Sequence, residues 1–165
     1  MESHSFTDAI EHLTRRVEAL EGRPAVEAVD RGDDPLWILN GIKQRVDAPG
    51  AVVFAGAVST VAGPVEWQVG FPVERILEDD WSARASSLAS LGNPVRLSIL
   101  HAVIAGATTV GQLSEGMGTT GQLYHHLNQL VAQGWLHSEG RGNYSIPAER
   151  VVPLLVILSA ARRTS

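Results

Sequence analysis

The sequence predicts a mainly α-helical chain with small β elements. Three observations support this class. Apolar residues recur at helical spacing in several segments, and residues 65–69 alternate between apolar and polar as a half-buried strand does. The C-terminal half combines helix caps, apolar stripes and glycine-containing turns. A chain of 165 residues that is 44% hydrophobic is long enough for one ordinary domain with appendages.

Composition excludes several classes of function. Cysteine is absent, which rules out disulfides, thiolate metal sites and cysteine nucleophiles. No run approaches the roughly 18 apolar residues of a membrane span, and the N-terminus lacks the order of a signal peptide. We therefore expect a cytoplasmic protein without a membrane partner.

Charge is distributed unevenly along the chain. Residues 1–82 carry 7 basic and 15 acidic side chains, whereas residues 83–165 carry 6 and 3. The net charge of -5 thus arises in the N-terminal half. The C-terminal half alone suits a polyanionic partner.

The first segment, residues 1–22, is predicted to be a coiled-coil-like helix. Its apolar residues are spaced by four and three, which is a heptad seam with β-branched a and leucine d positions typical of parallel dimers. We expect it to dimerise, although packing on its own domain is the alternative for so short a seam. The seam residues are Phe6, Ile10, Leu13, Val17 and Leu20.

A linker at 23–35 and a helix plus β-hairpin segment at 36–81 are expected to follow. Prolines, glycines and charges without periodicity indicate the linker. The hairpin strands flank a predicted five-residue loop, "TVAGP". Trp37 and Trp67 are expected to be core residues, with a ligand pocket as the alternative.

The sequence predicts a winged helix-turn-helix domain over residues 82–147, which opens with a helix at 82–91. Asn93 caps a helix that has Pro94 at its first position, and Thr108 or Thr109 caps a second short helix. After a "GMG" turn, Thr119 or Thr120 caps a third helix, residues 120–133. The sequence "LHSEGRGNYSI" then reads as two short strands around a Gly-Arg-Gly tip.

Four blocks of this region are similar to those of a known family. The segments "LGNPVRLSILHAV", "TVGQLSE", "GQLYHHLNQLVAQGWL" and "GRGNYSI" resemble ArsR-type winged helix-turn-helix transcriptional regulators, over roughly residues 82–160. The resemblance implies a regulator that binds double-stranded DNA. The cysteine pair of the family's thiol-based metal sensors is absent here, and the C-terminal helix has no histidine. We therefore expect no metal and no cofactor, and leave open a small-molecule or protein effector. The N-terminal extension is atypical of the family.

The third helix and the wing hold the expected DNA contacts. Helix geometry points His125 outward, while His126 turns about 100° away beside the buried seam, either packing or reaching a phosphate. Thr119 and Thr120 serve equally well as caps or phosphate ligands. Arg96 is expected to meet either a phosphate or an internal carboxylate. The full set is Arg96, Thr119, Thr120, Gln122, Tyr124, His125, His126, Asn128, Gln129, Arg141 and Asn143, with Gln122, Tyr124 and His125 as base readers.

The final segment, 148–165, is predicted to be a dimerisation helix. It is apolar nearly all round and needs cover on two sides. Leu154, Leu155 and Leu158 are the expected interface residues, and packing against helix 82–91 is the alternative. Pro153 is expected in the first turn of this helix.

Taken together, these features predict a homodimeric DNA-binding repressor that occludes its operator. A winged-helix module that binds proteins rather than DNA is the second hypothesis, because cations are few. An enzyme is not expected, since no nucleophile, carboxylate pair or phosphate loop has catalytic spacing.

Overall fold

The computed structural model describes residues 34, 36–114 and 119–163. The predicted helix 1–22, its seam residues and nearly all of the linker lie outside the described residues. The chain divides into two compact units, with the boundary between Gln44 and Arg45. In the first unit, helix α2 spans Trp37–Lys43. Trp37 is 64% exposed, so the prediction that this side chain is a core residue is wrong.

The second unit begins with a long β-hairpin. Strands β1 (Ala51–Thr60) and β2 (Gly63–Pro72) pair antiparallel along their whole lengths, which leaves two residues in the turn instead of the predicted five. Pro64 fits inside β2 because it lies on the outer edge. The Val73 N–H donates to the Gly50 carbonyl (3.0 Å), so these two residues form a hydrogen-bonded pair. Such pairs recur at every second residue along the strands, and Pro64 lies between two of them, where its missing N–H removes no hydrogen bond to β1.

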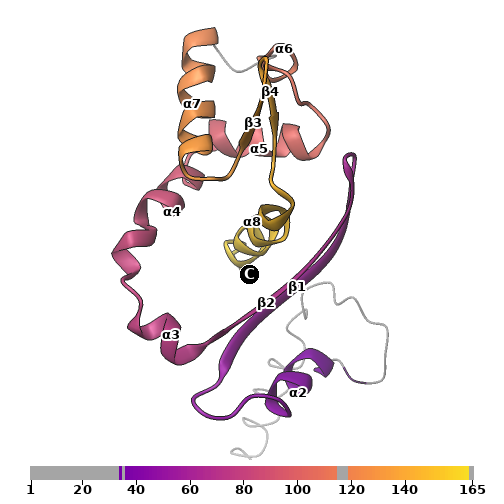
Figure 1. Cartoon of the computed structure of the whole chain (residues 1–165), viewed down its shortest axis with the longest axis vertical. Helices are drawn as coiled ribbons and strands as arrows, with labels where there is room; N and C mark the ends of the chain where they lie inside the picture. The colour runs from indigo at the N-terminus through magenta and orange to yellow at the C-terminus, as the bar shows by residue number, and fades with distance from the viewer. Residues whose placement is uncertain (1–33, 35, 115–118, 164–165) are drawn as a thin grey trace, which may run out of the picture. The chain divides into compact units, whose positions relative to one another are not determined.

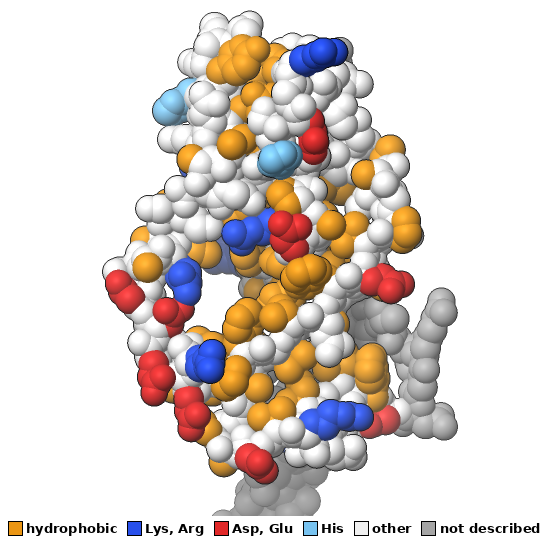
Figure 2. All heavy atoms as spheres, in the orientation of Figure 1, with side chains coloured by type: hydrophobic (Ala, Val, Ile, Leu, Met, Phe, Trp, Pro, Cys, Tyr) orange, Lys and Arg blue, Asp and Glu red, His pale blue; other side chains and the backbone are white. Residues whose placement is uncertain are grey.

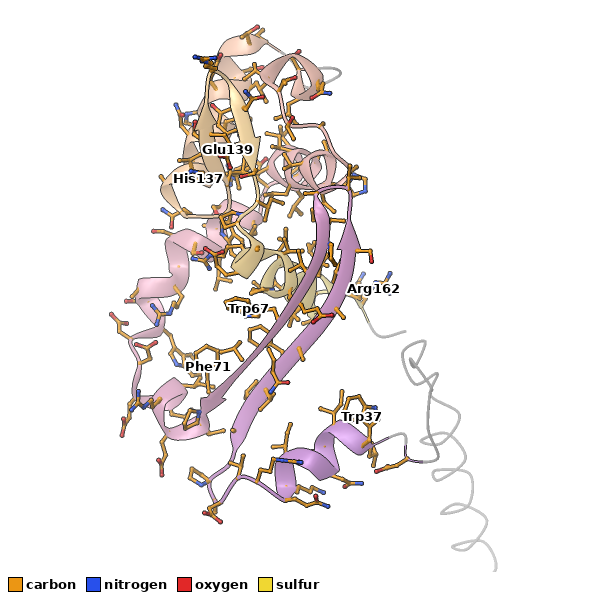
Figure 3. The ribbon with its side chains drawn as sticks, turned by 45° about the vertical axis from the view of Figure 1, so that its right-hand side comes forward. Trp37, Trp67, Phe71, His137, Glu139 and Arg162 are labelled. Carbon is orange, nitrogen blue, oxygen red and sulfur yellow. The ribbon has the colours of Figure 1, made fainter. Side chains whose placement is uncertain are left out.

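One face of the hairpin, which we call the apolar face, carries almost all of its large side chains. In the strand register these residues alternate with smaller or polar ones on the opposite face. Figure 3 shows Trp67 and Phe71 projecting on the same side of β2. Trp67 is 38% exposed, so it is not a core residue as predicted. The apolar face consists of Val52, Phe54, Val58, Val65, Trp67, Val69 and Phe71.

Short helices connect the hairpin to the helix-turn-helix. Helix α3 spans Val73–Glu78, and the predicted helix 82–91 is a 3-10 turn, η1 (Trp81–Arg84), followed by α4 (Ala85–Leu91). The Asp80 side chain accepts from the Ser82 N–H (2.9 Å) and so caps η1. Arg84 pairs with Asp79.

The winged helix-turn-helix contains the main hydrophobic core. Helices α5 (Pro94–Ile104), α6 (Val110–Leu113) and α7 (Thr120–Ala132) precede a wing of β3 (His137–Gly140) and β4 (Asn143–Ser145). Figure 1 shows these elements gathered together, with helix α8 between them and the hairpin. Together they confirm the predicted mainly α fold with small β elements. The fully buried side chains include Ile99, Leu100, Leu113, Leu123, Leu127 and Leu130.

Helix α8 (Ala148–Ala160) packs on two sides within the chain. Leu154 is 1% exposed and belongs to the winged-helix core, while Val152 lies against the hairpin. A Cβ added to Gly56 would lie 3.0 Å from Val152 Cγ1, so a larger residue at this position would require Val152 to move. Of the other predicted interface leucines, Leu155 is half-buried and Leu158 is 38% exposed.

The position of Pro153 differs from expectation. The helix begins at Ala148 after Pro147, so Pro153 lies inside it rather than in its first turn. Pro147 has φ -54° and supplies the rigid entry that was expected of Pro153. None of the described helices is both long and apolar enough to cross a membrane.

Candidate nucleic-acid interface

Helix α7 starts at a reciprocal capping box. The Thr119 hydroxyl accepts from the Gln122 N–H at 3.5 Å, and the Thr119 N–H donates to Gln122 Oε1 at 3.4 Å. Both distances are long for hydrogen bonds, so the box is weak in this state. The sequence left open whether Thr119 or Thr120 caps this helix. In the structure Thr119 is the cap and Thr120 is the first helical residue.

The outer face of α7 is polar and lacks acidic residues. Leu123, Leu127 and Leu130 bury the inner face, and this places His125 on the opposite side with Tyr124 (43% exposed) beside it. No carboxylate occurs in the helix sequence "TGQLYHHLNQLVA". A polyanion can therefore approach the outer face without charge repulsion. The exposed residues of the outer face are Thr120, Gln122, Tyr124, His125 and Asn128.

The wing turns sharply at Arg141. This residue has φ 53°, and Gly140 and Gly142 on either side have φ 85° and 76°. Positive φ at both central residues of a two-residue loop suits the right-handed twist of a hairpin. For arginine, however, this conformation costs about 1–2 kcal/mol relative to ordinary backbone. Arg141 is exposed and has no hydrogen bond or ion pair with the described residues.

The wing is anchored to the start of α6. The Tyr144 N–H donates to the Thr108 carbonyl (2.8 Å), and the Val110 N–H donates to the Gly142 carbonyl (3.0 Å). Thr109 also forms an isolated bridge with Asn143. Thr109 caps α6 as one of the two predicted candidates, but its role in holding the wing depends on a partner far along the chain. No local sequence pattern predicts this contact between Thr109 and Asn143.

Arg96 turns inward. Its guanidinium donates to the Ala89 carbonyl (2.9 Å), to the Ser90 carbonyl and to Gln129 Oε1 (2.5 Å). These acceptors belong to the end of α4 and to α7, so Arg96 ties the two helices together. The internal partners are carbonyl oxygens rather than the predicted carboxylate. Gln129, also predicted to contact DNA, is half-buried and holds Arg96 instead of lying on the outer face of α7.

Substituting Arg96→Lys is expected to lower the free energy of unfolding by about 1–3 kcal/mol. A single ammonium group cannot donate to all three acceptors as the planar guanidinium does, so partly buried acceptors are left without a donor. Urea denaturation measures the loss. Arg84→Lys is the control, because Arg84 pairs with Asp79 at the exposed surface, where ion pairs contribute little. Equal effects of the two substitutions would contradict a clamping role for Arg96.

The two histidines of α7 have different surroundings. His125 is exposed, whereas His126 is half-buried and its Nδ1 atom is buried without a hydrogen-bond partner among the described residues. Their rings meet edge to face with centroids 5.7 Å apart. Burial, then the positive charge of Arg96 and the neighbouring His125, lower the pKa of His126 below its usual value. The fold thus favours the neutral form of His126 over the protonated form.

This lowered pKa predicts a loss of stability in mild acid. Near and below pH 6.5 the unfolded chain binds a proton at His126 that the folded chain resists, so the free energy of unfolding falls as pH decreases through this range. Urea midpoints at successive pH values between neutrality and mild acid test this. His126→Gln is expected to flatten the slope, and His101→Gln, at an exposed position, is the matched control. A slope that survives His126→Gln would assign it to other groups.

No metal centre is evident within residues 36–114 and 119–163, where no group of three or more histidines and carboxylates lies close enough together to hold an ion. The wing adds one acidic group, Glu139, whose carboxylate accepts from the Ser145 hydroxyl at 2.6 Å. Figure 3 shows Glu139 beside His137 on the wing strand β3. Between the start of α5 and the end of β4, the described cations are Arg96 and Arg141.

Five of the predicted DNA-contact residues lie exposed on the outer face of α7, namely Thr120, Gln122, Tyr124, His125 and Asn128. The structure also contains a cation–π contact that the sequence did not single out. Arg150 of α8 lies over the Trp135 ring at 5.0 Å from its centroid. This contact links the segment after α7 to α8, since Trp135 lies three residues beyond the end of α7. The Trp135 indole N–H also donates to the Ser87 carbonyl (3.2 Å). The signal was absent from the sequence because it joins residues far apart in the chain.

Comparison with known proteins agrees with this geometry. Residues 91–139 match a family model described as a helix-turn-helix domain, from the end of α4 to the first wing strand. No curated protein and no solved structure matches the chain significantly. The match covers less than a third of the 165 residues. It supports DNA as a partner, and the chain thus contains a winged helix-turn-helix domain of the kind that DNA-binding regulators carry.

Proposed function

We propose that the chain is a homodimeric DNA-binding transcriptional regulator, a repressor of the ArsR-like type that acts by occluding its operator. The observation that carries the proposal is the outer face of α7, which is exposed, polar and free of carboxylates on a domain that matches a helix-turn-helix model. Operator occlusion needs no catalytic group and no cofactor.

In this proposal α7 enters the major groove. Its 13 residues span about 20 Å, and a helix of ordinary width fits a groove about 12 Å wide. Gln122, Tyr124 and His125 then face base edges, with Asn128 one turn further along the helix, and amide and imidazole groups can discriminate between base pairs there. The N-terminus of α7, with Thr119 and Thr120, faces a phosphate.

In the same proposal the wing supplies the positive charge that contacts the DNA. Arg141 at the tip reaches the backbone or the minor groove, and Asn143 sits behind it, where its side-chain amide donates to the Gly140 carbonyl (3.3 Å). A strained, exposed arginine without a partner among the described residues is consistent with a contact outside the chain. Arg96 and Gln129 act in this proposal by positioning α7 rather than by touching DNA.

Selection of bound fragments from the host genome by the purified full chain tests the proposal. Enrichment of a palindrome whose half-sites lie about one helical turn apart is the expected result. The affinity of the selected site is then measured at two salt concentrations for the unmodified protein, for His125→Ala and for Asn128→Ala. Loss of sequence preference in these variants, with unchanged thermal stability, would support base reading by α7. No enriched sequence would overturn the proposal.

A protein-interaction module is the second candidate. It is favoured by one observation: of the two described cations between α5 and β4, Arg96 is committed to internal acceptors, which leaves Arg141. Few phosphate contacts give weak nonspecific DNA binding and a shallow dependence on salt. One experiment separates the two functions. Substituting both His125 and Arg141 by alanine is expected to abolish DNA binding if the chain is a DNA-binding regulator, and to leave binding of a protein partner intact if it is a protein-interaction module.

A further inference from the structure

The outer edge of strand β1 has no strand partner among the described residues. The hairpin is a sheet of two strands in the order β1-β2, so each strand has one free edge. An isolated two-stranded hairpin is marginally stable in water, and unpaired edge groups readily accept another strand. The packing of α8 on the apolar face supports the hairpin but satisfies no edge group of β1.

The bonded pair of Gly50 and Val73 identifies the free edge groups. Alternate residues of an antiparallel strand direct their N–H and C=O groups to opposite edges. Counting in steps of two from Gly50, every second residue of β1 directs its backbone N–H and C=O groups to β2. The residues between them direct these groups to the outer edge. The outward-facing residues of β1 are Ala51, Val53, Ala55, Ala57 and Ser59.

The two edges of the hairpin differ in chemistry. The outward positions of β2 include Pro64 and Pro72, which lack an N–H, and the charged Glu66. Prolines and charges are the features by which natural sheets prevent edge pairing. The ten residues of β1, "AVVFAGAVST", contain neither. The β2 edge is thus blocked, whereas the β1 edge offers every donor and acceptor.

From these observations we infer that two copies of the chain associate through their β1 edges to form a continuous four-stranded antiparallel sheet. A second copy is the fitting occupant because a strand related to itself by a two-fold axis is antiparallel and self-complementary. The absence of charge in β1 removes repulsion between the copies. Residues 1–33 suit this edge less well, since their sequence predicts a helix and a proline-containing linker.

The register follows from the length of the edge. The outward groups pair completely only when the two-fold axis passes through their middle, at Ala55, which then lies opposite Ala55 of the partner subunit. An axis normal to the sheet keeps the apolar faces of both copies on one side. Val52, 52% exposed in the single chain, gains Val58 of the partner subunit as its neighbour. Figure 2 shows apolar side chains gathered at the surface around the hairpin and α8, and a second copy would cover part of this surface.

Disulfide capture in the full chain tests this pairing. The natural sequence has no cysteine, so Ala55→Cys introduces a single thiol. Directly opposed, hydrogen-bonded residues have Cα atoms about 5.5 Å apart, which a disulfide spans. Mild oxidation without DNA is expected to yield a covalent dimer. Gln68→Cys is the matched control: it is the register partner of Ala55 on β2, is likewise exposed and shares the same face, and it is expected to remain monomeric.

Amide hydrogen exchange of the unmodified protein provides a second measurement, which does not depend on any variant folding. The outward amides of β1, those of Val53, Ala55 and Ala57 among them, are expected to become more protected as protein concentration rises. The outward amides of Gln68 and Gly70 on β2 are expected to exchange freely.

The possible outcomes distinguish a second copy of the chain from the chain's own residues as the occupant of the β1 edge. Cross-linking at position 55 but not at 68, with concentration-dependent protection of β1, supports the inference. Cross-linking at 68 alone, or free exchange along β1, overturns it. Protection of β1 that does not change with concentration, together with no cross-linking at position 55, overturns it as well, because the edge is then covered by the chain's own residues. None of these results depends on whether α7 binds DNA.

Discussion

Arg141→Ala is expected to weaken binding to the selected operator by about tenfold or more and to reduce the slope of log affinity against log salt by about one for each protomer. The reason is that Arg141 is the described cation between α5 and β4 that is free of internal partners. Fluorescence anisotropy with a labelled operator, at several salt concentrations, measures both quantities.

Two further variants separate the contact from the fold. Arg141→Gly relieves the positive φ of 53°, so the protein is expected to lose DNA affinity without losing thermal stability. Arg162→Ala removes an exposed cation that follows α8, and its effect on affinity is expected to be small. If Arg162→Ala weakened binding as much as Arg141→Ala does, general charge rather than the wing would account for the loss.

Leu127→Ala is expected to lower the free energy of unfolding by about 2–5 kcal/mol, a large part of the roughly 5–15 kcal/mol available to a domain. Leu127 is fully buried in the core beneath α7, and the truncated side chain leaves a cavity there. Urea or thermal denaturation followed by circular dichroism measures the loss.

The matched control for this prediction lies two residues earlier on the same helix. His125→Ala changes an exposed side chain, so its effect on stability is expected to stay within about 0.5 kcal/mol while sequence-specific DNA binding falls. Comparable stability losses at the two positions would mean that the outer face of α7 is packed against something, and that it is not open to DNA.

The sequence predicted the local features of the helix-turn-helix well. Asn93 caps α5, with its side chain accepting from the Val95 and Arg96 N–H groups, and Pro94 occupies the first turn. Thr109 and Thr119 cap the next two helices. These signals are carried by residues within a few positions of each other, so they can be read without knowledge of the fold.

Contacts between distant segments could not be predicted in this way. The hydrogen bond from Arg96 to Gln129 joins residues 33 positions apart, and it turns two expected DNA ligands into internal partners. Likewise, the approach of Val152 to Gly56 covers a side of α8 that was expected to need a second chain. The exposed apolar residues of the hairpin were missed because a strand pattern shows which face is apolar but not how much of it another element covers.

The place of α8 in the core sets the limits of any fragment that is meant to fold. The matched region ends at residue 139, yet Tyr144 and Leu154 belong to the same hydrophobic cluster as Leu123 and Leu127. A piece cut at the end of the match would expose that cluster to water and is expected to aggregate. The smallest autonomous winged-helix unit therefore extends through residue 160, a whole helix beyond the boundary that sequence similarity marks.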